Sequence, residues 1–117
     1  MKNRPFHERL GFAIAGIVTT LRKEQSFRLQ ILAAIAVVVV LVWLRPAPLW
    51  WALFALSIAA VLAAELLNTA VEHLADHLHP DLHPRIKDLK DCGAAAVLIA
   101  SVGALCVAVA FLIDLVR

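Results

Sequence analysis

Charged residues are scarce in this 117-residue chain, at 17% of the sequence, whereas hydrophobic residues make up 62%. A soluble domain of this length has too high a surface-to-volume ratio to bury so much apolar side chain. Lipid must therefore cover the excess, and the length leaves room for one domain, spanning 1–117. The formal net charge is only +2. Because no basic run with interleaved aromatics is present, we expect no nucleic-acid partner.

Several signatures of common site chemistry are missing. The sequence contains no Walker A loop, no G-x-G-x-x-G and no H-E-x-x-H. Its two cysteines, Cys92 and Cys106, stand fourteen positions apart. On one helix that separation is ~21 Å, too long for a disulfide within the chain. The apolar run near the N-terminus is interrupted at 22–24 by Arg, Lys and Glu, so we expect no secretory signal peptide.

Three apolar stretches predict an all-α integral membrane protein with three spanning helices. The expected spans cover about 28–45, 49–70 and 92–115. Proline-containing turns separate them, the second span continuing as helix to about Leu78 and a short polar segment, 85–90, leading into the third. Trp43, Trp50 and Trp51 surround the first turn, as is typical of an aromatic belt at a membrane interface.

The segment from about 6 to 26 has a different pattern. Apolar side chains recur there at three- and four-residue steps between Lys and Arg. This periodicity predicts an amphipathic helix lying in the membrane interface, and a helix packed on the bundle is the alternative. Most Lys and Arg residues precede the first span or lie between the second and third. The positive-inside rule therefore predicts a cytoplasmic N-terminus and 79–90 loop, with the C-terminus on the other side.

A polar stripe stands out at the end of the second span. Glu65, Asn68, Glu72 and Asp76 follow one another at spacings of three, four and four, so they share one face of a helix. Each ionisable group near hydrocarbon costs at least ~2.5 kcal/mol on insertion scales. Such a stripe therefore indicates a site, although a buried carboxylate–lysine network that fixes helix association is the structural alternative.

Other polar residues should reach the same depth of the membrane. Glu24 ends the amphipathic segment, and Lys90 and Asp91 open the third span. Carboxylate and amide oxygens suit Mg²⁺, which usually takes one or two carboxylates together with substrate phosphates. A lysine can pair with phosphate as a point charge. Glu65, the deepest carboxylate of the stripe, is the candidate general base.

Four histidines lie close together in the sequence at the end of the second span: His73, His77, His79 and His83. The first two are four residues apart on a helix, a spacing that can hold a divalent ion such as zinc. No cysteine accompanies them, so solvated or headgroup-contacting histidines are the favoured interpretation.

Three motifs together give the sequence its family resemblance. They are E-Q-S-F-R-L-Q at 24–30, A-E-L-L-N-T-A-V-E at 64–72 and K-D-C-G-A-A-A-V-L at 90–98. With these motifs the chain, from roughly 12 to 112, resembles the prokaryotic integral-membrane diacylglycerol kinase and undecaprenol kinase family. Gln30 departs from the pattern, because some members have glutamate there.

The resemblance implies a role for each matching position. It makes Glu65 the general base, Asn68 an active-site amide beside it, and Glu24 and Glu72 the ligands of a Mg²⁺ ion that bridges the ATP phosphates. Further nucleotide contacts are implied at Phe12, Asp76, Asp81, Leu82, His83, Lys90 and Asp91. Lipid contacts are expected at Glu65, Arg28 and Ala94.

The resemblance also implies what the protein does and how it assembles. We expect a bacterial inner-membrane homotrimer with composite sites between protomers, using MgATP to phosphorylate a lipid alcohol. Diacylglycerol is the first choice of acceptor, giving phosphatidic acid, and undecaprenol is the second. Two other classes compete: an ion-coupled transporter with Glu65 as its proton-binding carboxylate, and a structural scaffold indifferent to that residue.

Overall fold

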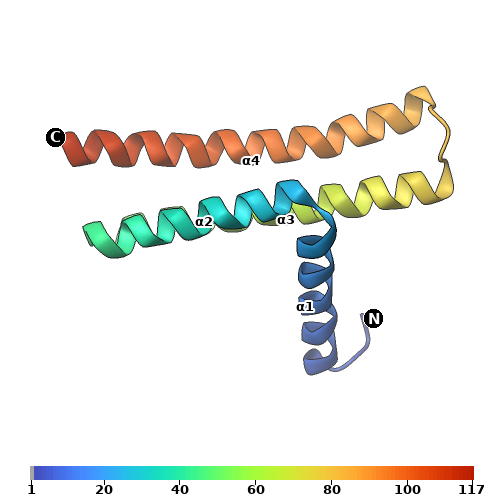
Figure 1. Ribbon diagram of the computed structural model, residues 1–117, viewed down its shortest axis with the longest axis horizontal. Helices are drawn as coiled ribbons and strands as arrows, with labels where there is room; N and C mark the ends of the chain where they lie inside the picture. Colours follow the sequence, from blue (N-terminus) through green and yellow to red (C-terminus); the bar gives the residue numbers. More distant parts are fainter. Residues whose placement is uncertain (1) are drawn as a thin grey trace.

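The computed structural model describes residues 2–117, which form four helices and so confirm the all-α prediction. Helix α1 spans Phe6–Lys23, α2 Gln25–Leu44, α3 Pro48–Leu78 and α4 Pro84–Val116. Figure 1 shows α2, α3 and α4 running alongside one another, whereas α1 lies across their direction. Helix α3 is the central element, because it contacts each of the other three.

The N-terminal helix ends earlier than the predicted boundary near residue 26. Glu24 leaves the helical region with φ −112° and ψ 112°, so the chain changes direction there and Gln25 already belongs to α2. Arg28 stabilises this corner, since its Nη1 donates to the carbonyls of Leu21 and Arg22 at 2.9 and 3.0 Å. Those carbonyls lie in the last turn of α1, where intrahelical donors run out.

The first turn between spanning helices follows from proline chemistry. Arg45 takes a left-handed conformation at φ 50°, and its backbone N–H still bonds to the Leu41 carbonyl. Pro48 then occupies the first turn of α3, where its missing N–H costs no helical hydrogen bond.

At the opposite end, α3 reaches Leu78 as predicted, and α4 begins at Pro84, eight residues before the predicted third span at 92. The polar segment 85–90 is therefore helical and not a separate connector. Pro84 fixes the backbone at the first position of this helix, and the His83 ring accepts a hydrogen bond from the Arg85 N–H. Lys87 and Asp91, four residues apart, form an ion pair at 2.7 Å that stabilises the first turns of α4.

Three of the helices, α2, α3 and α4, are long and apolar enough to cross a membrane. Only 6 to 11% of the residues in their most apolar windows are buried within the chain. Their large apolar side chains therefore need lipid or other protein to cover them. Helices α3 and α4, of 31 and 33 residues, are ~46 and ~50 Å long and exceed the ~30 Å hydrocarbon core. Their polar ends project past the start of α2 (Figure 1).

A small, mainly aromatic core joins α2, α3 and α4 at the other end of the bundle. Phe54 and Phe111 pack edge to face at 5.3 Å, and Leu41 completes the buried cluster. Trp50 faces inward onto these rings, and its indole N–H donates to Asp114 at 3.1 Å. Trp43 is 82% exposed, whereas Trp50 is a packing residue of this core.

Candidate functional site

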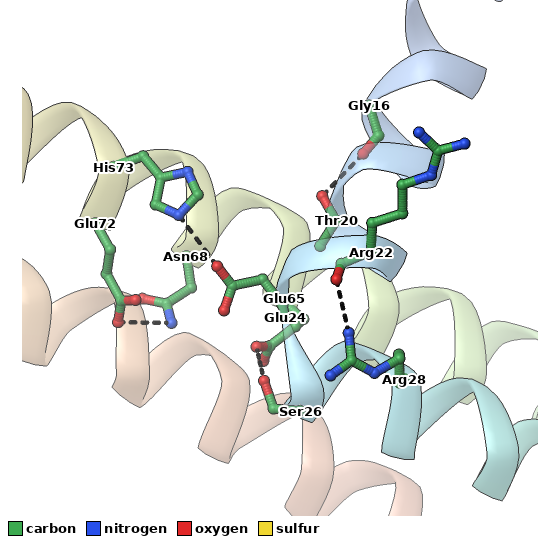
Figure 2. Close-up of polar contacts among 10 residues, drawn as sticks. All are labelled: Gly16, Thr20, Arg22, Glu24, Ser26, Arg28, Glu65, Asn68, Glu72 and His73. Atoms are coloured by element: carbon green, nitrogen blue, oxygen red, sulfur yellow. Dashed lines mark hydrogen bonds and ion pairs between the residues drawn. The ribbon is translucent and has the colours of Figure 1, made fainter.

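The Glu65 carboxylate is buried between α3 and α2, with 7% of the residue exposed. Ser26 Oγ donates to Glu65 Oε1 over 2.6 Å, and Gln30 Nε2 donates to Oε2 over 3.2 Å. Figure 2 shows the Ser26 hydroxyl meeting this carboxylate across the gap between the two helices. Each oxygen thus receives one hydrogen bond from α2, which offsets part of the cost of burying the group.

One turn farther along α3, Asn68 and Glu72 form a pair. Asn68 Nδ2 donates to Glu72 Oε1 over 3.2 Å, and both side chains extend toward α4 (Figure 2). The Asn68 Oδ1 atom is buried and has no hydrogen-bond partner within residues 2–117. It lies against Gly93 of α4, in the space that a Cβ on residue 93 would fill. A buried amide oxygen without a partner is uncommon in folded proteins and marks this contact between α3 and α4 as a candidate functional feature.

Glu24 reaches the same region from the α1–α2 corner. Its Oε1 lies 3.1 Å from His73 Nε2 on α3, the residue that follows Glu72 (Figure 2). In the described part of the chain, no three His, Cys, Asp or Glu side chains come close enough together to hold a metal ion. Two separate carboxylates fit Mg²⁺ only if phosphate oxygens, water or another subunit supply the remaining ligands.

A second polar cluster lies where α3 gives way to α4. Lys90 Nζ contacts Asp76 Oδ1 at 2.5 Å and so joins the two helices. A hollow of about 210 Å³ is lined here by residues of the loop and of the first turns of α4: His79, Pro80, Asp81, Leu82, Ile86, Lys87, Lys90 and Asp91. Four of the predicted nucleotide contacts, Asp81, Leu82, Lys90 and Asp91, therefore share one surface.

His83 lies beside that hollow, with its ring edge-on to His79 at 5.4 Å. Its Nδ1 is engaged by the Arg85 N–H, so its observed role is to cap α4. His73 also has a partner, Glu24, while the His79 ring bonds to the Asp81 carbonyl. The structure therefore distributes these histidines among different partners.

Three other predicted residues lie apart from these clusters. Arg28 bonds to carbonyls at the end of α1, Phe12 is exposed on α1, and Ala94 is exposed on α4 next to Gly93. Phe12 lines a hollow of about 350 Å³ together with Lys2, Arg9 and Ala13. None of the three contacts Glu65 within this chain, and their roles stay predictions.

Four residues without a predicted role contact the site: Ser26, Gln30, His73 and Gly93. A sequence signal existed for two of them, because Ser26 and Gln30 are polar residues four apart at the start of an apolar helix. His73 and Gly93 depend on how α1 and α4 meet α3, which the periodicity of one helix does not reveal.

The arrangement offers a buried, doubly hydrogen-bonded carboxylate beside an amide and further carboxylates, with a lysine at the far end. This set can accept a proton, hold a hard divalent cation with its phosphates, and pair with an anion. The three functions occur in sequence along α3, at Glu65, at Asn68–Glu72 and at Asp76 with Lys90.

Comparison with known proteins gives two matches. Residues 11–112 match the family described as Prokaryotic diacylglycerol kinase. A curated relative, the undecaprenol kinase of Bacillus subtilis (strain 168), is 36% identical over 87 residues, which cover 74% of this chain and 71% of the relative. The family match contains every residue to which the motifs assign a site role.

Proposed function

This chain belongs to the prokaryotic diacylglycerol kinase family, and we propose that it transfers the γ-phosphoryl group of MgATP to the hydroxyl of a membrane lipid alcohol. The position of Glu65 is the observation that carries the proposal. It is a buried carboxylate near the start of α2, and the two later carboxylates of the stripe, Glu72 and Asp76, lie toward the projecting end of α3. A lipid hydroxyl at headgroup depth and a water-soluble nucleotide can meet there.

In this reaction Glu65 is the base. The lipid O–H bond breaks as the oxygen attacks the γ-phosphorus, the proton passes to the Glu65 carboxylate, and the bond to the β-phosphate oxygen breaks to release ADP. Asn68, one turn away, would orient the reacting groups with its buried Oδ1. Phosphoryl transfer needs mainly positioning and charge neutralisation, so a helical bundle without a nucleotide-binding loop can perform it.

Glu24 and Glu72 would hold the metal ion, which supplies charge neutralisation on the phosphate oxygens. Their donor chemistry fits Mg²⁺, and having only two carboxylates leaves coordination positions for phosphates and water. Each of these carboxylates has one side-chain partner in the structure: Glu24 contacts the His73 ring, and Glu72 contacts the Asn68 amide. Both contacts can be exchanged for metal coordination without leaving a charged group buried.

The hollow beside the α3–α4 loop is the proposed site for the nucleotide. Lys90 would pair with phosphate, with Asp76 and Asp91 holding the lysine-rich first turns of α4 in place. Asp81, Leu82 and His83 would face the adenine end, and Phe12 of α1 would cover the nucleotide. Phe12 lies on a different helix from the hollow, so this role requires either a neighbouring protomer or the full span of a bound nucleotide.

A homotrimer in the bacterial inner membrane completes the proposal. Much of α4 is exposed and built from small residues, among them Ala94 and Gly103, which let helix backbones approach closely in a membrane. Sites shared between protomers would bring Ala94 and Arg28 toward the lipid. The N-terminus and the 79–90 loop would be cytoplasmic, and the C-terminus periplasmic or extracellular, following the Lys and Arg distribution.

Two acceptors are candidates. The family description points to diacylglycerol, whereas the relative that is 36% identical is an undecaprenol kinase. The second similarity is to one named enzyme across 74% of this chain, so we rank undecaprenol ahead of diacylglycerol.

A substrate panel tests the function directly. The purified full chain in detergent–lipid micelles is given MgATP with diacylglycerol, with undecaprenol, with both, or with neither, and phosphorylated lipid is measured with labelled ATP. We expect lipid-dependent phosphate transfer, faster with undecaprenol. ATP consumption that is unaffected by either alcohol, with no labelled lipid, contradicts a lipid kinase, and preference for diacylglycerol reverses the ranking of acceptors.

A further inference from the structure

One face of α2 holds the Glu65 carboxylate at both of its oxygens. Ser26 and Gln30, which supply the two hydrogen bonds, are four residues apart, so they lie one above the other on the helix. The bonds therefore come from a single rigid element and reach across to a second, α3. The first turns of α2 are themselves held on α1 by Arg28.

Each carboxylate oxygen of Glu65 accepts one of the two hydrogen bonds. Ser26 occupies Oε1 and Gln30 occupies Oε2, and an ionised carboxylate has about four lone-pair sites. Ser26 and Gln30 fill two of these sites, and no other side chain of α2 donates to the rest. Because each oxygen is tied separately, the carboxylate plane cannot rotate freely about its last torsion.

The Gln30 amide is oriented by this contact. With Nε2 donating to Glu65, the amide places its own Oε1 elsewhere, where that atom is buried without a hydrogen-bond partner among the described residues. The opposite amide orientation would place two acceptors against each other. The amide therefore keeps its hydrogen bond to Glu65 and leaves its own carbonyl oxygen without a partner, although an unsatisfied buried carbonyl is costly.

We propose that Ser26 and Gln30 are positioning residues that fix the Glu65 carboxylate so that one defined lone pair meets the lipid hydroxyl. This inference rests on the proposed function, in which that lone pair takes the hydroxyl proton as the oxygen–phosphorus bond forms. A displacement of about 1 Å at a reacting group can lower a rate by a hundredfold. Losing one of two restraints should have a smaller effect, because the other remains.

Kinetics of matched variants test the proposal. Ser26→Ala and Gln30→Met each remove one donor while keeping a good helix former, and each should lower kcat by about tenfold. The KM for MgATP should stay within about twofold, because neither side chain faces the proposed nucleotide site. Ser26→Thr, which restores the hydroxyl, should recover most of the rate.

Ser57→Ala is the control. Ser57 Oγ also sits on a spanning helix and is also hydrogen-bonded, but to the Leu53 carbonyl of its own helix at 2.8 Å. It shares with Gln30 the lining of a cavity of about 230 Å³ between α2, α3 and α4. The kcat of Ser57→Ala should match that of the unmodified chain. A loss of rate in Ser26→Ala alone then comes from the lost Glu65 donor and not from removing a hydroxyl from the bundle.

A double-mutant cycle with Glu65→Gln completes the experiment. Adding Ser26→Ala to Glu65→Gln should not lower the residual rate further, and thermal unfolding in detergent should show coupling between the two positions. A normal kcat in both Ser26→Ala and Gln30→Met overturns the proposal, even where unfolding shows coupling. So does an equal further loss in the Glu65→Gln background.

The same variants distinguish failure of the proposed function from failure of the positioning role alone. If the unmodified chain phosphorylates no lipid, or Glu65→Gln keeps full activity, the proposed function fails and the positioning role falls with it. If Glu65→Gln is inactive while the Ser26 and Gln30 variants are normal, the function stands and only the positioning role is overturned.

Discussion

The side-chain oxygen of Asn68 occupies the space beside Gly93 where the Cβ of any other residue would stand. This close approach joins the acidic stripe of α3 to the first turns of α4. Glycine at position 93 thus determines how near the two helices come at the site.

Gly93→Ala should displace the Asn68 amide and lower kcat by about tenfold or more, because the amide oxygen is an active-site acceptor in the proposed reaction. Gly11→Ala, a glycine inside α1, is the control, since no neighbouring atom lies within 4 Å of its added Cβ. Alanine in a helix is favoured over glycine by ~1 kcal/mol, so this control should be as stable as the unmodified chain or more so. Equal activity in both variants would show that the contact has no part in catalysis.

Glu72→Gln should raise the Mg²⁺ concentration needed for half-maximal rate by about tenfold or more, because one of two proposed ligand carboxylates becomes a neutral amide. The Asn68 contact can survive in the variant, which limits structural damage. Titration of activity with Mg²⁺ at fixed ATP measures the change. Glu8→Gln, a carboxylate on α1 that pairs with Arg4, is the control and should not shift the titration.

Lys90→Met should raise the KM for ATP about tenfold, because a phosphate-facing cation is lost from the hollow beside the α3–α4 loop. Lys87→Met removes a cation of the same helix that is 65% exposed and paired with Asp91, and its effect should be less than about threefold. Initial rates over a range of ATP concentrations compare them. A larger effect at Lys87 would place the nucleotide elsewhere on this surface.

Phe111→Ala should lower the free energy of unfolding by on the order of 3 kcal/mol, because Phe111 is 5% exposed and packs against both Trp50 and Phe54. Its neighbour Leu112 is 59% exposed, and Leu112→Ala should change stability by less than about 1 kcal/mol. Unfolding in detergent measures both. Similar losses would mean that Leu112 is covered by another subunit.

Much of the fold was predictable, because the length of an apolar stretch and its helical periodicity can both be read from one continuous segment of sequence. Three long apolar helices, the proline turn after Leu44 and the continuation of α3 to Leu78 follow from such local rules. The same rules did not predict that the helix of the third span begins at Pro84. Polar composition at 85–90 indicates where lipid ends, but helices can continue into water when they are capped, as His83 and Pro84 cap α4.

Motifs and spacing along the sequence propose the members of the candidate site, but they do not give the contacts among those members. Glu65 contacts Ser26 of α2, Asn68 and Glu72 contact each other on α3, and Glu24 contacts His73. Which side chains orient them depends on how helices cross, and no periodicity along one segment encodes that. The contacts of His73 and Gly93 are therefore visible only once the α1–α2 corner and α4 are packed on α3.

Turnover of the Glu65→Gln variant with a lipid alcohol and MgATP tests the central claim most directly. Asp114→Asn is its control, because Asp114 is a second carboxylate within a long apolar helix and bonds only to the Trp50 indole among the described residues. The proposed base predicts at least a hundredfold loss of lipid phosphorylation for Glu65→Gln in a chain that still folds, and near-normal turnover for Asp114→Asn. Near-normal turnover of Glu65→Gln would contradict the account.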